Sequence, residues 1–188
     1  MKRTFFWLGM LVMILAFGIA VLGACKSAPK AYAVIEEPLT PDANSAVIYF
    51  FGTRSSGNIW DGETPIGSFS EGPLVAGIAY KTTPGEHYFM ANASNWVVMR
   101  ADLEPNKRYY LRISPLPSPP FTQLIAMVRL NKEEGDAWMQ QVKHQPISFT
   151  DEWRAEFAQG KRLQGAQENL QSAKNKSMEV DLSGINGY

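Results

Sequence analysis

Apolar and polar residues alternate over short runs between residues 45 and 130, and this pattern predicts β-strands. Residues 46–51 are apolar on both alternating faces, which is typical of a central strand covered on both sides. Similar runs, with turn residues between them, lie at residues 58–60, 64–69, 74–80, 87–91, 96–103, 108–113 and 121–130. Residues 115–120 contain four prolines, which cannot donate hydrogen bonds in a sheet, so we expect a loop there. The pattern favours a mainly β fold, a sandwich of about seven strands.

After the last predicted strand, the apolar spacing changes to that of a helix. Asn131, followed three residues later by Glu134, resembles a capping box, and Pro146 ends this first helix. Thr150 can cap a second helix. The apolar stripe of that second helix recurs at spacings of three and four, at Trp153, Phe157, Gly160, Leu163, Ala166, Leu170 and Ala173. We therefore expect two C-terminal helices after the sandwich.

The first 24 residues have the three parts of a secretory signal. Two basic residues open this segment, residues 5–21 are apolar, and small residues precede Cys25, the single cysteine of the chain. An apolar stretch of this length could also span a bilayer, for which ~20 residues are needed. A spanning helix requires no particular residues at its end, whereas this segment ends in Leu-Gly-Ala-Cys. The sequence therefore favours cleavage over an uncleaved spanning helix.

The residues Leu22-Gly23-Ala24-Cys25 resemble the lipobox of bacterial lipoproteins. This resemblance implies that signal peptidase II cuts before Cys25 and that the Cys25 sulfur carries fatty chains such as palmitate, which anchor the protein to a membrane. Lys26 stands where an Asp commonly signals retention in the inner membrane. The resemblance therefore implies the outer membrane, on its periplasmic or surface face, as the location.

Residues 26–44 are rich in Ala, Pro, Glu and Thr without a sustained period, as a tether would be. The alternative is that residues 32–35 add an edge strand to the domain. The predicted organisation is a lipoprotein signal peptide (1–24), a lipid-anchored tether (25–44), a β-sandwich domain (45–130), a helical appendage (131–175) and a flexible tail (176–188).

Charge and cysteine content narrow the classes of partner. Cleavage of the leader would remove two of the 18 basic residues and leave 16 against 18 acidic ones, a net charge near −2. No basic field remains that would suggest nucleic acid as a partner. With Cys25 lipidated, no cysteine is left for a disulfide, so the apolar core must stabilise the fold by itself.

The β region resembles a known kind of envelope module. The run at residues 46–50, the hairpin Asp61-Gly62-Glu63-Thr64-Pro65-Ile66-Gly67, the turn Pro84-Gly85-Glu86-His87 and the strand at residues 106–111 occur in this order after the lipobox. Together they are similar to an uncharacterised small β domain of bacterial lipoproteins, related to PEGA-type surface modules. The resemblance covers about residues 45–115. It implies an antiparallel, Ig-like or transthyretin-like sandwich in the cell envelope, a domain of unknown function with no established chemistry.

Residues that could carry catalysis are sparse. His87 and His144 have no second ligand at metal spacing, and we interpret them as a strand-end residue and a helix C-terminal charge. The sequence has no G-x-S-x-G motif and no glycine pattern that would bind phosphate. An enzyme would need Glu86, His87 and another carboxylate to converge in a pocket. We therefore expect no catalytic, metal or cofactor-binding residue and no cofactor.

Aromatic side chains are the remaining candidates for binding. They lie in or beside predicted strands, where they either fill the core or form an exposed platform: Trp60, Tyr80, Tyr88, Trp96, Tyr109 and Tyr110. Trp60, at a hairpin edge, is the candidate for exposure. Trp153 and Phe157 are the candidates on the helical stripe.

Two functions follow for a lipid-anchored envelope protein that is not an enzyme. The first is a structural or protein-interaction module, in which the helix of Trp153 and Phe157 docks on the sandwich or contacts another envelope protein. The alternative is a module that binds glycan or peptidoglycan through Trp60 and neighbouring aromatic side chains.

Overall fold

A computed structural model describes residues 31–52, 56–69, 77–142 and 145–176 of the chain. The predicted signal peptide, Cys25, His144 and the C-terminal tail from residue 177 lie outside the described residues. The described residues form ten strands: β1 (Tyr32–Val34), β2 (Ala46–Gly52), β3 (Gly57–Asp61), β4 (Thr64–Phe69), β5 (Ile78–Thr82), β6 (Gly85–Asn92), β7 (Trp96–Leu103), β8 (Arg108–Pro115), β9 (Ile125–Leu130) and β10 (Ile147–Phe149). They also form three helices: α2 (Lys132–Gln141), α3 (Asp151–Phe157) and α4 (Gly160–Lys176).

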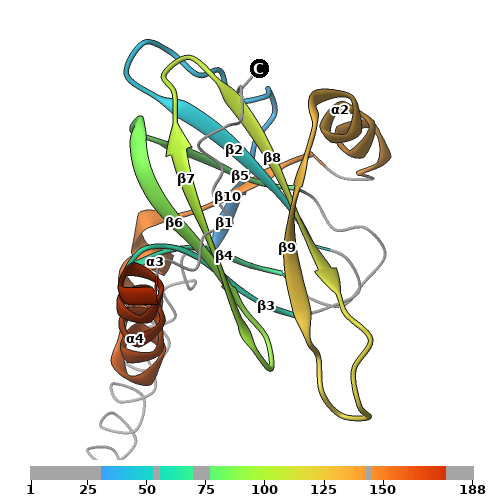
Figure 1. Cartoon of the computed structure of the whole chain (residues 1–188). Helices are drawn as coiled ribbons and strands as arrows, with labels where there is room; N and C mark the ends of the chain where they lie inside the picture. Colours follow the sequence, from blue (N-terminus) through green and yellow to red (C-terminus); the bar gives the residue numbers. More distant parts are fainter. Residues whose placement is uncertain (1–30, 53–55, 70–76, 143–144, 177–188) are drawn as a thin grey trace, which may run out of the picture. The chain divides into compact units, whose positions relative to one another are not determined.

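The strands form two sheets that face each other as a sandwich (Figure 1). One sheet has the order β1-β10-β5-β2-β8-β9 and the other the order β4-β3-β6-β7. On one side of the sandwich the edge strands β7 and β9 lie beside each other, and on the other side the edge strand β4 lies beside β10. This arrangement confirms the prediction of a mainly β sandwich with helices near the C-terminus.

Two strand pairings differ from the antiparallel pattern that the family resemblance implies. β2 pairs in parallel with β8, and β10 pairs in parallel with β5. Parallel neighbours need a long connection, and the whole second sheet lies between β2 and β8 along the chain. The strands also exceed the predicted seven, partly because β1 and β10 have three residues each and are too short to show a period.

The predicted central strand, β2, is buried on both faces. Ile48 and Phe50 belong to the apolar cluster between the two sheets. Tyr49 and Phe51 belong to a second cluster on the outer face of the larger sheet, where Trp138 of α2 covers them. Because both faces are covered, the strand reads as a continuous apolar run, which is the pattern the sequence shows.

Helix α2 begins as predicted. The Asn131 side chain accepts a hydrogen bond from the backbone of Glu134, and the Glu134 carboxylate accepts one from the backbone of Asn131. The helix packs against β8, where the Tyr110 hydroxyl donates to Asp136 over 2.8 Å. Burial raises the pKa of Tyr110 to about 12, and this hydrogen bond adds to the shift. The capping box thus fixes the start of the helix, and Tyr110 fixes its position on the sheet.

The second predicted helix is divided into α3 and α4. Thr150 caps α3 as predicted, accepting a hydrogen bond from the backbone of Trp153. Gly160 has a φ of +57°, a left-handed conformation that ends one helix and starts the next at a new angle. The residues before α3 form β10, which joins the larger sheet between β1 and β5. Residue 130 is therefore not a domain boundary, because β10 lies beyond it and belongs to the larger sheet.

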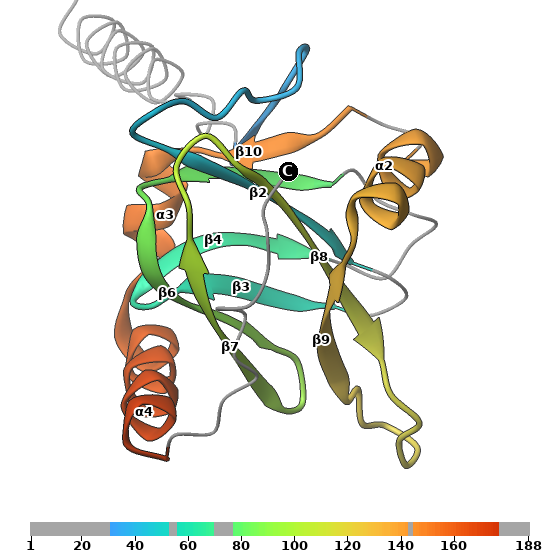
Figure 2. The same cartoon turned by 45° about the horizontal axis from the view of Figure 1, so that its top comes forward.

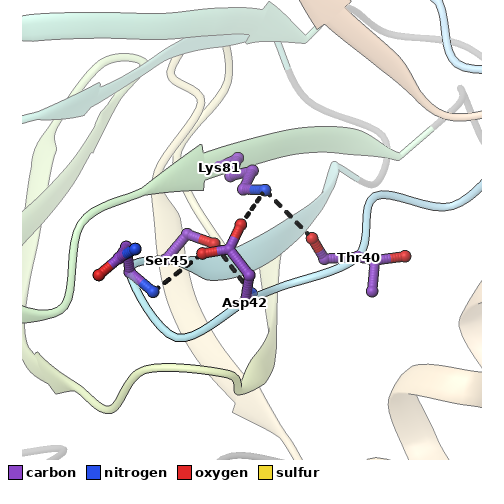
Figure 3. A network of polar contacts seen from close by, with 5 residues as sticks. Thr40, Asp42, Ser45 and Lys81 are labelled. Carbon is purple, nitrogen blue, oxygen red and sulfur yellow. Dashed lines mark hydrogen bonds and ion pairs between the residues drawn. The ribbon is translucent and has the colours of Figure 1, made fainter.

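Residues 31–44 are part of the domain, which corrects the prediction of a tether through residue 44. β1 pairs with β10 at the edge of the larger sheet, the alternative considered for this segment. Figure 3 shows how the segment is tied to β5: Lys81 donates to the Asp42 carboxylate over 2.7 Å and to the Thr40 carbonyl over 3.3 Å. The hydrogen bond from Lys81, supported by those from Asn44 and Ser45, lowers the pKa of Asp42 to about 2.

Candidate functional site

A cleft of about 860 Å³ opens at one end of the sandwich. The β6–β7 turn and the loop between β8 and β9 lie at this same end in both views of the molecule (Figures 1 and 2). We call it the Phe121 cleft, and its lining residues are Ser56, Gly57, Asn58, Ser68, Phe69, Asn92, Ala93, Ser94, Phe121, Thr122 and Gln123. These lining side chains are amides, hydroxyls, two phenyl rings and small groups, and none of them is charged.

The strands place three polar side chains of the Phe121 cleft in one row. Asn58 of β3 lies opposite Ser68 of β4 on one side and opposite Asn92 of β6 on the other. Opposed residues of antiparallel strands project from the same face of a sheet, so the three side chains lie next to one another. The Asn58 amide nitrogen is 3.4 Å from the Asn92 side-chain oxygen, longer than a usual N–H···O hydrogen bond. This weak pairing leaves both amides available to a ligand.

Gly57 allows this row to form. A Cβ atom at position 57 would overlap the backbone carbonyl oxygen of Asn92 and approach the Phe69 ring to 2.8 Å. Any residue larger than glycine would therefore push β3 away from β6 at the start of the strand.

Hydrogen bonds to the β6–β7 turn hold the loop between β8 and β9 in place. The Ser94 backbone donates to the Gln123 carbonyl over 3.1 Å, and the Ser94 hydroxyl accepts from the Gln123 backbone over 2.9 Å. The Asn95 side chain donates to the Ile125 carbonyl and accepts from the Ile125 backbone, over 3.0 and 2.8 Å. Three prolines, at positions 117, 119 and 120, further restrict the backbone of this loop. The rim of the cleft is therefore preorganised.

Phe121 is displayed at this rim. Its side chain is fully exposed, at 106% of the reference area, and its φ is +65°. A bulky residue rarely has a positive φ, and such strain costs roughly 1–3 kcal/mol. The sequence suggested a strand beginning at Phe121, but β9 begins at Ile125. The signal that could have identified the site is the Pro-Pro-Phe sequence, which cannot continue a sheet ladder.

Trp60, the predicted exposed aromatic residue, is buried. Only 1% of Trp60 is exposed, which corrects the sequence prediction. Helix α4 covers Trp60 through Ala166 on the outer face of the smaller sheet, and Phe157 lies beside the indole ring at a centroid distance of 5.6 Å. The location of Trp60 at a hairpin suggested an edge, but a helix about a hundred residues later in the chain covers it.

Trp153 and Phe157 are half-buried and connect the helices to the core. Their rings stack at 4.5 Å, and Trp153 lies 4.4 Å from Phe149. Trp153 also packs against the cluster between the sheets, and Phe157 against that of Trp60. Of the two alternatives for this helical stripe, docking on the sandwich is the one observed. None of the three predicted binding residues lines the Phe121 cleft.

His87 lies away from the Phe121 cleft, in a cluster with Asp61 and Tyr80. Its Nδ1 is 2.8 Å from the Asp61 carboxylate and its Nε2 is 2.9 Å from the Thr83 carbonyl oxygen. Both partners are acceptors, so this geometry suits an imidazolium ion with a proton on each nitrogen. Glu86, the other residue an enzyme would require, pairs with Arg100. The arrangement ties β6 to β3 and leaves His87 no unpaired nitrogen with which to act as a base.

The His87 cluster gives the stability a definite dependence on pH. Burial disfavours the charged imidazole, but the hydrogen bond and charge of Asp61 and the Thr83 carbonyl outweigh it, so the pKa is raised above 6.5. The contacts of protonated His87 therefore stabilise the fold fully below pH 6.5, the pKa of an ordinary histidine. This stabilisation is lost as the pH rises through the higher pKa that His87 has in the folded protein. The stability difference between wild type and His87→Gln should therefore be larger at about pH 5.5 than at about pH 9. Urea denaturation at both pH values measures it; a difference that grows with pH would contradict this assignment.

The described residues form neither a membrane-spanning helix nor a metal cluster. No helix in the described part of the chain has both the length and the apolar character needed to cross a bilayer. Among the same residues, no three His, Cys, Asp or Glu side chains gather as a metal site would require.

No family model, curated protein or solved structure matches this chain. The resemblance to PEGA-type modules therefore stays a prediction.

Proposed function

We propose that this chain is a lipid-anchored cell-envelope protein that acts as an interaction module rather than an enzyme, with the Phe121 cleft as its binding surface. One observation carries the proposal: a fully exposed phenyl ring is held at a positive φ over a preorganised cleft. Exposing the ring to water and straining its backbone both cost free energy. A partner that covers the ring would remove its apolar surface from water. Such a partner would also explain why the fold keeps the strained backbone that exposes the ring.

The lipobox sequence supports the location in the envelope. Lipidation of Cys25 would anchor the domain to a membrane, and Lys26 favours the outer membrane. The resemblance of residues 45–115 to envelope modules agrees with this location.

The anchor can be tested by replacing Cys25. We expect Cys25→Ala to abolish incorporation of labelled palmitate and to block cleavage of the leader, because the modified sulfur marks the cleavage site. Phe121→Ala is the matched control and should be labelled and cleaved as the wild type. Mass spectrometry of the N-terminus and a density gradient that separates the two membranes provide the measurements. An unmodified wild-type N-terminus starting at Met1, or wild-type protein in the inner membrane, would contradict the respective part of the proposal.

The binding surface can be tested by crosslinking in living cells. A photoreactive phenylalanine at position 121 should form adducts with an envelope component, because the ring is the exposed centre of the proposed contact. The same group at Glu133, an exposed position on α2, is the control and should give few adducts. Equal crosslinking at the two positions would mean that the Phe121 cleft is not the contact surface.

A further inference from the structure

We infer that the Phe121 cleft binds an uncharged glycan chain, of the kind formed by N-acetylated sugars in the bacterial cell wall. This inference rests on the proposed function, because it names the ligand of the same cleft. It transfers the glycan hypothesis from Trp60, which is buried, to Phe121, which is exposed.

The polar lining suits hydroxyl groups. Asn58, Asn92 and Gln123 carry amides, and the cleft also contains hydroxyls from Ser68 and Thr122. Amides and hydroxyls can both donate and accept hydrogen bonds, as can sugar hydroxyls and N-acetyl groups. None of the described lining side chains is charged, so these residues offer no ionic partner to an anionic ligand such as a phosphate or an acidic peptide.

The geometry suits an extended chain of sugar units. Ser68, Asn58 and Asn92 stand on three adjacent strands, which are spaced about 4.8 Å apart. This step is close to the repeat of one sugar unit in an extended glycan, so successive units can meet successive polar side chains. The volume of the cleft, about 860 Å³, lies within the range of ligand-binding pockets.

Phe121 supplies the apolar part of the recognition. The C–H face of a sugar ring packs on the flat face of an aromatic side chain, and the exposed Phe121 ring offers such a face at the rim. The loop is already held by Ser94 and Asn95, so binding costs little ordering of the backbone.

The composition of the cleft favours a glycan over a protein. Protein interfaces usually have a buried apolar centre and a polar rim. Here the order is reversed: polar side chains line the cleft and the exposed aromatic ring stands at its rim. The other phenyl ring of the lining, Phe69, is only 6% exposed.

The test is binding of the full-length lipidated protein, in detergent, to a tetramer of N-acetylglucosamine and, in a second arm, to isolated cell-wall sacculi. We expect the wild type to bind both. Phe121→Ala should bind at least about fivefold more weakly, and Phe121→Trp should bind as well as or better than the wild type, because it keeps a flat aromatic face. Glu133→Ala is the control and should bind like the wild type.

Failure of the wild type to bind either probe, or equal binding by Phe121→Ala, would overturn the inference. If crosslinks from position 121 still formed, to a protein, the glycan inference would fail and the proposed binding surface would stand. If no crosslinks formed either, both would fail. Thermal unfolding of each variant shows that it is folded, which is expected because the Phe121 side chain contacts solvent.

Discussion

Replacing Trp60 with alanine should lower the free energy of unfolding by about 3–5 kcal/mol, the largest effect that we expect from a single substitution in this chain. Trp60 is the largest of the fully buried side chains, and it fills the space between the smaller sheet and helix α4. Removing it would leave a cavity against Ala166 and Phe157, which the helix can fill only by moving toward the sheet. Urea denaturation followed by circular dichroism measures the loss.

Two further variants make this prediction specific. Trp60→Phe should cost less than Trp60→Ala, because it leaves a smaller cavity and removes the indole N–H, which is buried without a hydrogen-bond partner among the described residues. Phe121→Ala, the exposed counterpart, should stay within about 0.5 kcal/mol of the wild type. A Trp60→Ala protein as stable as the wild type would show that Trp60 is not in the core.

Gly135→Ala should destabilise the protein by about 1–3 kcal/mol, although alanine is the better helix former. A Cβ atom at position 135 would overlap the Tyr110 ring, so α2 would have to move away from the sheet. That movement would also disturb the hydrogen bond from Tyr110 to Asp136 and the packing of Trp138 on β2.

Whether Gly135→Ala lowers or raises the free energy of unfolding shows whether packing or helix propensity dominates at this position. On a solvent-exposed face, replacing glycine by alanine should stabilise a helix by up to about 1 kcal/mol. Gln140→Ala, at an exposed position of the same helix, is the control and should leave stability nearly unchanged. A stabilised Gly135→Ala variant would mean that α2 does not pack closely on Tyr110.

Local patterns predicted the parts of the fold that depend on neighbouring residues. The Asn131–Glu134 capping box, the Thr150 cap and the hairpin of β3 and β4 all lie where the sequence places them. The two-sided apolar character of residues 46–51 correctly indicated a central strand. In each case, the residues that determine the structure lie within a few positions of one another.

Contacts between distant residues were not predictable in the same way. β1 and β10 are defined by their pairing with each other, across more than a hundred residues of chain. The same holds for Trp60, whose burial depends on the distant helix α4. Tyr80, Tyr109 and Tyr110 are buried as well, so these three tyrosines fill the core and do not form an exposed platform.

The candidate site depends on long-range contacts even more than the core does. Ser68, Asn58 and Asn92 form a row because of strand register, and register requires the full set of pairings. Phe121 was assigned to a strand because its neighbours alternate in polarity. Its position at the rim depends on hydrogen bonds that join Ser94 to Gln123 and Asn95 to Ile125, across two different hairpins. Local patterns in one sequence do not reveal such contacts.

Hydroxyl-radical footprinting tests most directly the claim that a partner binds at Phe121 and not at Trp60. In the purified protein we predict rapid oxidation of Phe121 and protection of Trp60, in accordance with their exposed areas of 106% and 1%. In intact envelopes, Phe121 should become protected as the partner covers its ring. Equal oxidation of Phe121 in both preparations, or rapid oxidation of Trp60 in the purified protein, would contradict the claim.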